Sequence, residues 1–262
     1  MAKIYDSITE LVGDTPLVRL HRYEKLENLE ANILGKFEYF NPSGSVKDRA
    51  ALNIIEEAEK RGDIKPGMTL VDYTSGNTGI GLSMCAAVMG LKIIICMPES
   101  MSIERRKTMT AYGAELVLTE GSKGMRGAIE KASELASEIP DSFIAGQFVN
   151  PSNPQIHRKT TGPEIWQDTG GKVDIFIAGV GTGGTLTGTA EYLKSQNSNI
   201  KVIAVEPFNS PVLSAGEPMR SPSKIIPFSS TRYAFILLLY SVAAITAFIV
   251  CIRFSASSKT ID

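Results

Sequence analysis

The feature that most constrains the fold of this chain is a regular alternation of short apolar runs and longer amphipathic segments between residues 32 and 206. Several apolar runs are dense in isoleucine and valine without polar alternation, which is typical of strands buried on both faces of a sheet. Strands are expected at 32–37, 69–73, 92–97, 115–118, 142–145, 174–178 and 201–205. Helices are expected between them, at 46–61, 78–88, 102–111, 123–138, 153–167 and 185–195. This alternation predicts an α/β fold with parallel sheets covered by helices on both faces.

Composition and charge argue against several classes of protein. The formal net charge is −1 at pH 7 and the charged residues are dispersed, so no nucleic-acid partner is expected. The three cysteines form no CxxC pair and the amino-terminal residues contain no apolar signal segment, which together favour a reducing, cytoplasmic location. The two histidines, His21 and His157, lie far apart, so no metal site is expected. His157 is interpreted as a helix-surface or interface residue.

The loops that follow the strands are the candidate chemical sites, because ligands of parallel α/β sheets bind at the carboxyl ends of the strands. The first loop is 41–49, Asn-Pro-Ser-Gly-Ser-Val-Lys-Asp-Arg, in which Ser45 is suited to be the N-cap of a helix. Lys47 then falls in the first helical turn, where the helix dipole disfavours an ammonium ion and makes the amine a better nucleophile. The alternative interpretation is a solvated lysine paired with Asp48.

The second loop, 74–79, directly follows an expected strand and opens an expected helix. It offers hydroxyl groups from Thr74, Ser75 and Thr78, an amide from Asn77, and glycines that let a ligand approach the backbone. A helix N-terminus of this composition suits a carboxylate or a phosphate. The alternative interpretation is a plain N-cap turn, for which asparagine and threonine are also well suited.

The third loop, 179–185, reads Gly-Val-Gly-Thr-Gly-Gly-Thr and lies between an expected strand and an expected helix. Backbone N–H groups exposed by glycine beside a helix start bind phosphate well. The loop also matches the pattern GxGxxG, and Glu206 ends the next strand, where a dinucleotide enzyme would hold a ribose. A nicotinamide- or flavin-dependent oxidoreductase is therefore a competing hypothesis.

Taken together, the three loops resemble, in order and spacing, those of the fold-type II pyridoxal-phosphate enzymes. The matching segments are 41–49, TSGNTGIGL at 74–82 and GVGTGGTLTG at 179–188. Within that family, the segments 8–20, 147–153 and 157–166 resemble the cysteine synthases, or O-acetylserine sulfhydrylases. Cystathionine β-synthases share the first two motifs and remain an alternative. The resemblance extends from Ile4 to Gly216.

The resemblance implies two open, twisted α/β domains with the cofactor, pyridoxal 5'-phosphate, between them. It implies a smaller mobile domain at 41–145 and a larger, incomplete domain at 1–40 plus 146–216. Lys47 would be the catalytic residue that holds the cofactor as an internal aldimine, and Asn77 would hydrogen-bond the ring hydroxyl of the cofactor. The implied ligands of the phosphate are Gly181, Thr182, Gly183, Gly184 and Thr185. The implied ligands of the substrate carboxylate are Thr74, Ser75, Asn77, Thr78 and Gln147.

The reaction implied by the resemblance is a β-replacement that makes L-cysteine from O-acetyl-L-serine and sulfide. Lys47 would remove the α-proton as general base, acetate would leave through an aminoacrylate intermediate, and sulfide would add. A homodimer is implied, and serine acetyltransferase is a partner of some members of the family. The alternative is a catalytically impaired relative that acts as a binding or membrane-tethered module.

The resemblance stops after Gly216. Residues 217–230 contain three prolines and are predicted to form a linker, and residues 231–253 contain an apolar segment. Its uncharged stretch, 233–252, would form a helix of about 30 Å, which is enough to span a bilayer. Three interpretations stay open: a membrane anchor, a buried helix that replaces missing core, and non-native sequence from a shifted frame or a missed splice.

Overall fold

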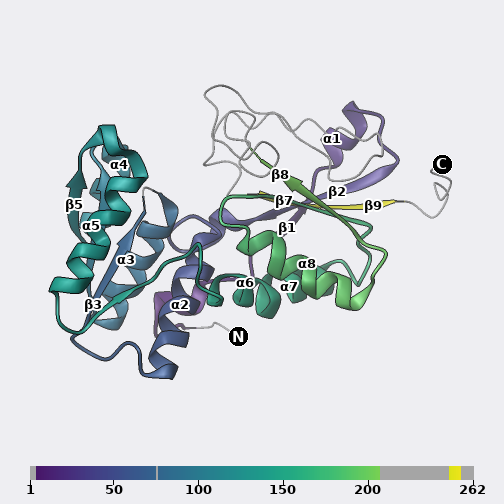
Figure 1. Ribbon diagram of the computed structural model, residues 1–262. Helices are drawn as coiled ribbons and strands as arrows, with labels where there is room; N and C mark the ends of the chain where they lie inside the picture. Colours follow the sequence, from purple (N-terminus) through teal and green to yellow (C-terminus); the bar gives the residue numbers. More distant parts are fainter. Residues whose placement is uncertain (1–3, 75, 207–247, 255–262) are drawn as a thin grey trace. The chain divides into compact units, whose positions relative to one another are not determined.

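The computed structural model describes residues 4–74, 76–206 and 248–254 (Figure 1). The chain divides into two compact units. The first unit comprises Met1–Val12 and Asn41–Asn153, and the second comprises Gly13–Phe40 and Pro154–Asp262. Each unit has its own sheet and its own hydrophobic core.

The first unit contains a four-stranded sheet in the order β5-β4-β3-β6, with every pair of neighbours parallel. Its strands are β3 (Thr69–Tyr73), β4 (Lys92–Pro98), β5 (Glu115–Thr119) and β6 (Ser142–Ile144). Its helices are η1 (Ile8–Leu11), α2 (Lys47–Arg61), α3 (Asn77–Met89), α4 (Ile103–Ala111), η3 (Gly121–Lys123) and α5 (Gly124–Glu138), of which η1 and η3 are 3-10 helices. The short helix α6 (Ser152–Ile156) begins in this unit and ends in the second. The predicted alternation of strands and helices is confirmed for this unit.

Helices cover both faces of this parallel sheet (Figure 1). On one face, Leu70 and Ile95 pack in a core with residues of α2, α3 and α4. On the other face, Val71 and Cys96 pack against Ala128 and other residues of α5. Neighbouring residues of one strand therefore enter different cores, which is why β3 and β4 are apolar without polar alternation.

The second unit contains a five-stranded sheet in the order β1-β2-β9-β7-β8. Its strands are β1 (Leu17–Arg19), β2 (Ala31–Phe37), β7 (Ile175–Gly179), β8 (Lys201–Val205) and β9 (Phe248–Phe254). Among these described strands, only β7 and β8 pair in parallel; β1 is antiparallel to β2, and β9 is antiparallel to both β2 and β7. The prediction of parallel sheets is therefore wrong for this unit. The connection from β1 to β2 holds only one short helix, which is too little chain for a parallel crossover.

The helical elements of the second unit are α1 (His21–Leu26), the 3-10 helix η2 (Glu38–Phe40), the π-helical segment η4 (His157–Thr161), α7 (Gly162–Asp168) and α8 (Gly184–Gln196). The single helix expected over 153–167 is thus interrupted by a π-helical turn. Its neighbour α8 approaches it very closely, because a Cβ atom on Gly188 would lie 1.9 Å from the carbonyl oxygen of Pro154. Only glycine fits at that contact.

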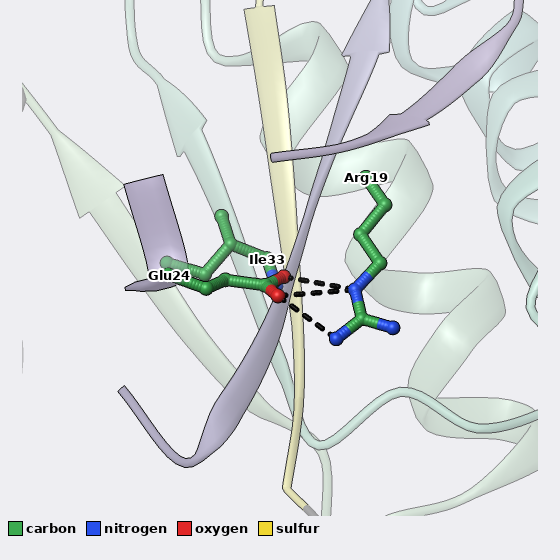
Figure 2. Close-up of polar contacts among 3 residues, drawn as sticks. All are labelled: Arg19, Glu24 and Ile33. Carbon is green, nitrogen blue, oxygen red and sulfur yellow. Dashed lines mark hydrogen bonds and ion pairs between the residues drawn. The ribbon is translucent and has the colours of Figure 1, made fainter. Parts of the chain in front are cut away.

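A buried carboxylate attaches α1 to the sheet of the second unit. Glu24 accepts the backbone N–H of Ile33 at 2.7 Å and forms an ion pair with Arg19, whose Nη2 lies 2.9 Å from Oε2 (Figure 2). These bonds lower the pKa of the Glu24 carboxyl although burial opposes the charge. One carboxylate therefore joins β1, α1 and β2.

The carboxyl end of the expected membrane-spanning helix is a strand. Residues 248–252 belong to β9, where Ile252 pairs with both Ile33 and Ile175. The prediction of a helix is wrong for these residues, because both edges of β9 complete a sheet ladder. Residues 233–247 and the predicted linker at 217–230 lie outside the described residues. Among the residues that the structure describes, no helix is long and apolar enough to cross a membrane.

Candidate functional site

Lys47 is the first residue of α2, in the first helical turn as predicted. Ser45 does not occupy the N-cap position, which belongs to Val46. The Ser45 hydroxyl instead accepts the backbone N–H of Lys47 at 3.2 Å. Serine thus satisfies one of the free N–H groups at the helix start, which is the physical role that the sequence assigned to it.

The interpretation of Lys47 as a solvated lysine paired with Asp48 is wrong. Asp48 is buried, and its carboxylate accepts the backbone N–H of Ser43 at 2.6 Å and also the Ser43 hydroxyl. Burial, with no compensating carboxylate among the described residues, lowers the pKa of the Lys47 ammonium to about 8. An amine with this pKa is partly neutral near physiological pH, and it can attack a carbonyl carbon or accept a proton.

The loop before α3 lies in the same unit as Lys47. The helices α2 and α3 pack closely at Gly81, where a Cβ atom would lie 3.1 Å from Cβ of Ala51 and 3.3 Å from Oδ1 of Asp48. Because Asp48 is the neighbour of Lys47, this contact sets the first turn of α2 beside the first turns of α3. The structure therefore brings Lys47 close to the amino-terminal half of α3, which begins at Asn77.

Polar groups at the start of α3 face a buried glutamine. The Thr78 hydroxyl donates to Oε1 of Gln147 at 2.6 Å, and both side chains are buried. The Thr74 hydroxyl oxygen accepts the backbone N–H of Gly76 at 3.4 Å. Since Oε1 of Gln147 is already used as an acceptor, the amide nitrogen of the same side chain is fixed as the donor end. Ser75 lies outside the described residues.

Gln147 is held by a turn that depends on a buried aspartate. Oδ1 of Asp72 accepts the backbone N–H of Gly146 at 3.1 Å, and Nδ2 of Asn153 donates to the Gln147 carbonyl at 2.9 Å. Gly146 has a φ of 57°, a left-handed conformation that suits glycine in this turn. Burial raises the pKa of the Asp72 carboxyl to about 6, and its Oδ2 has no partner among the described residues.

The glycine-rich loop lies in the second unit, between β7 and α8. Gly183 precedes the helix with a φ of 83°, and Gly181 and Gly183 would have open space around an added Cβ atom. The first backbone N–H of this region that reaches a carbonyl of the loop is that of Thr187, which donates to Gly183 at 2.9 Å. The Gly184 N–H donates to the Thr182 hydroxyl oxygen at 3.4 Å. The N–H groups of this first turn form the positive end of α8, and Thr185 also belongs to this turn.

His157 is the residue of this region that the sequence interpretation missed. Its sequence interpretation is a helix-surface or interface residue; it is 1% exposed, so the helix-surface interpretation is wrong. Its Nδ1 lies 2.9 Å from the Thr161 hydroxyl and its Nε2 lies 3.2 Å from the Thr185 hydroxyl. No local pattern could have revealed this contact, because Thr185 is far away in the sequence.

Cysteine and metal chemistry receive no support from the described residues. Cys85, Cys96 and Cys251 are buried and free, and burial raises their thiol pKa values to about 12, 11 and 12 respectively. Buried thiols of this kind behave as small apolar groups. No cluster of histidine, cysteine and acidic residues suited to a metal ion occurs in the described part of the chain.

Lys47, with its lowered pKa, begins a helix in one unit, and a glycine-rich loop precedes a helix in the other unit. The chain belongs to the family described as "Pyridoxal-phosphate dependent enzyme", whose profile matches residues 8–245. The predicted cofactor, pyridoxal 5'-phosphate, is thereby supported. The matches do not favour the dinucleotide-dependent oxidoreductase.

Within that family, the chain is similar to cysteine synthases. It is 54% identical over 232 residues to cysteine synthase A of Escherichia coli, which covers 86% of this chain and 70% of the relative. The structure resembles the cysteine synthase of Entamoeba histolytica, with a TM-score of 0.76, 48% identity and coverage of 84% of this chain. It also resembles an O-acetylserine dependent cystathionine beta-synthase from Helicobacter pylori, with a TM-score of 0.76, 38% identity and coverage of 86% of this chain and 75% of that chain. The chain spans 65% of the length of the Entamoeba structure.

Proposed function

We propose that the protein makes L-cysteine from O-acetyl-L-serine and sulfide by a β-replacement that depends on pyridoxal phosphate. The observation that carries the proposal is Lys47, which begins α2 and has a pKa lowered to about 8 by burial. The 54% identity to a cysteine synthase supports the choice of reaction. The amine, the substrate-binding loop and the phosphate-binding loop then have distinct tasks.

The phosphate of the cofactor fits the loop at the start of α8. The positive end of a helix, exposed N–H groups and threonine hydroxyls form an anion site, and the open space above Gly181 and Gly183 leaves room for an anion there. We propose Gly181, Thr182, Gly183, Gly184 and Thr185 as the phosphate ligands. A side chain at either of the two open glycines would occupy the space that the phosphate needs.

Lys47 would bind the aldehyde carbon of the cofactor through its amine. When bound, the cofactor accepts electron density from the α-carbon of the amino acid. Lys47 Nζ would then hold the proton removed from that carbon. With a pKa of about 8, the amine can both accept this proton and release it near neutral pH. An exposed lysine would be almost fully protonated at the same pH.

The carboxylate of the amino acid fits the start of α3. We propose as its ligands Thr74, Ser75, Asn77, Thr78 and Gln147, with Asn77 also toward the ring hydroxyl of the cofactor. The bond from the Thr78 hydroxyl to Gln147 leaves the amide N–H groups of Gln147 for the carboxylate. It also uses the hydroxyl proton of Thr78, so we assign the backbone N–H of Thr78, near the helix start, to the substrate.

The proposal includes the substrates, the oligomeric state and the location of the protein. The substrates are small molecules, and we expect a homodimer and a cytoplasmic location. An association with serine acetyltransferase stays a prediction for this chain. A cystathionine β-synthase-type reaction is the second candidate, because a structural relative at 38% identity is described as an O-acetylserine dependent enzyme of that kind. The two candidates share the first substrate and differ in the nucleophile.

The proposal is tested by a titration of the purified full chain with pyridoxal phosphate. We expect a visible absorption band that Lys47→Ala abolishes and Lys60→Ala leaves in place, since Lys60 is an exposed residue of the same helix. O-acetylserine should change the band, and sulfide should then yield cysteine. A preparation that shows no band refutes the assignment of Lys47. A band without cysteine formation indicates a catalytically impaired relative, and cystathionine from homocysteine without cysteine from sulfide indicates the second candidate.

A further inference from the structure

Thr185, one of the proposed phosphate ligands, contacts the buried His157 of the π-helical segment η4. The imidazole of His157 lies between two hydroxyl groups, with Nδ1 2.9 Å from Thr161 Oγ1 and Nε2 3.2 Å from Thr185 Oγ1. Neutral imidazole carries one proton, so one ring nitrogen donates and the other accepts. The tautomer therefore decides the direction of both hydrogen bonds.

The surroundings of Thr161 favour one of the two tautomers. Thr161 is 0% exposed, and its hydroxyl lies within hydrogen-bond distance of His157 Nδ1. If Nδ1 carried the proton, the Thr161 hydroxyl would accept from it and would need another acceptor for its own proton. Among the described residues, this hydroxyl has no hydrogen bond to a backbone carbonyl, whereas the Thr160 hydroxyl donates to the Ile156 carbonyl at 2.8 Å. The Thr185 hydroxyl is 9% exposed at the start of α8, where solvent or a ligand can accept its proton, whereas Thr161 is 0% exposed. Because an unsatisfied buried donor is strongly unfavourable, Thr161 donates to Nδ1 and the ring proton resides on Nε2.

This direction has a consequence for Thr185. A proton on Nε2 is donated to Oγ1 of Thr185, and the hydroxyl proton of Thr185 is then left for another acceptor. With the opposite tautomer, the Thr185 hydroxyl would donate to the histidine and could offer an anion only its lone pairs, which repel it. Thr185 lies in the first turn of α8, where an anion is favoured by the helix dipole.

We propose that His157 is a positioning residue that, as the Nε2–H tautomer fixed by Thr161, orients the Thr185 hydroxyl to donate to the cofactor phosphate. The proposal rests on the proposed function, because it takes Gly181–Thr185 as the phosphate site. It adds a residue outside the loop and a definite proton position to that site. The close contact between Gly188 of α8 and Pro154 of α6 holds Thr185 and His157, which lie near it in the chain, in place.

The proton position can be measured by nitrogen NMR of the full chain. The protein has two histidines, so two sets of ring nitrogen signals are expected, and the exposed His21 serves as the internal reference. At about pH 8, where an unperturbed imidazole is neutral, we expect His157 to show the Nε2–H tautomer without and with pyridoxal phosphate. A signal of the Nδ1–H tautomer in either state would overturn the proposal.

Binding measurements test the consequence for the phosphate. His157→Leu should weaken the binding of pyridoxal phosphate by about tenfold to a hundredfold, the effect of losing a hydrogen bond to a charged group. His157→Gln, whose amide can donate to Thr185, should recover much of the affinity. The binding of pyridoxal, which lacks the phosphate, should change little in both variants. In Thr185→Val, the additional substitution of His157 should have no further effect on phosphate-dependent affinity.

The outcomes separate the two proposals. If wild-type protein binds neither pyridoxal phosphate nor pyridoxal, the proposed function fails, while the tautomer measured in the free protein still tests the proton position. Two results would show that His157 does not act through the phosphate. In the first, His157→Leu weakens the binding of pyridoxal as much as the binding of pyridoxal phosphate. In the second, His157→Leu lowers the affinity for pyridoxal phosphate by the same factor in the Thr185→Val protein as in wild type. Near-ultraviolet circular dichroism of each variant, together with the rescue by glutamine, distinguishes a local effect from loss of folding.

Discussion

Removal of the Lys47 amine should stabilise the cofactor-free protein at neutral pH. Burial lowers the pKa of this ammonium from 10.5 to about 8, so the folded state disfavours the charge that the unfolded chain carries freely. In the unfolded chain the lysine stays protonated up to about pH 10.5. Lys47→Met keeps a side chain of similar length and removes the charge.

The magnitude and sign follow from the two pKa values. The difference between 10.5 and about 8 corresponds to about 3 kcal/mol. Because the side chain is only half-buried, solvent screening reduces the expected gain for Lys47→Met to about 1–3 kcal/mol at pH 7. Between about pH 8 and pH 10.5 the unfolded state binds more protons, so wild-type stability rises with pH and the advantage of the variant shrinks.

The assay is urea unfolding of the apoprotein at several values between about pH 7 and 9.5, followed by circular dichroism. Lys60→Met is the matched control, because Lys60 lies in the last turn of the same helix, is exposed and pairs with Glu57 at 3.0 Å. The control should give no gain in stability, and its difference from wild type should not shrink with pH. A Lys47→Met protein that is no more stable than wild type at pH 7, or whose gain does not change with pH, refutes the burial argument.

Three further predictions follow from buried contacts. Asp72→Asn should stabilise the protein at pH 7 by about 2–3 kcal/mol, because burial raises the pKa of the carboxyl from 3.8 to about 6. In unfolding measurements, this stabilisation should be lost toward pH 4, where the Asp72 carboxyl of the folded wild-type protein is neutral too. Thr78→Val should raise KM for O-acetylserine about tenfold and change kcat less, because Gln147 loses its 2.6 Å anchor; equal effects on both constants in steady-state kinetics would contradict this. Gly188→Ala should destabilise the protein by about 2 kcal/mol or more, because the added methyl group would meet the Pro154 carbonyl. Alanine favours an isolated helix by about 1 kcal/mol over glycine, so a higher midpoint of thermal unfolding would refute the close contact.

The elements of the first unit were largely predictable, because each of them carries its signal in its own residues. The expected strand 69–73 coincides with β3, and the helix expected at 46–61 is α2 with one residue fewer. The strands β1 and β9 and the helix α1 were not predicted. Strand β1 has three residues, α1 has six, and β9 lies inside an uncharged run whose length suggested a helix. The two strands form because β1 pairs with β2, and β9 pairs with both β2 and β7, which are distant from it in the sequence.

The site shows the same division between local pattern and distant contact. The loops around Lys47, Thr74 and Gly181 were predictable because glycines, hydroxyls and a helix start occur together in short segments. The bond from Thr78 to Gln147 and the bond from Thr185 to His157 join residues far apart in the chain. A sequence pattern identifies the groups that can bind, but it does not identify the distant partners that orient them.

The sequence by itself therefore determined the alternating α/β architecture, the three loops rich in glycine and hydroxyl groups, and the position of Lys47 in a first helical turn. These depend on hydrophobic period, turn residues and helix starts, which act over a few neighbouring residues. The tertiary structure alone decided the antiparallel strands of the second unit and the direction of the Asp48 carboxylate toward Ser43. It also decided the burial that lowers the Lys47 pKa, because desolvation depends on everything packed around a group.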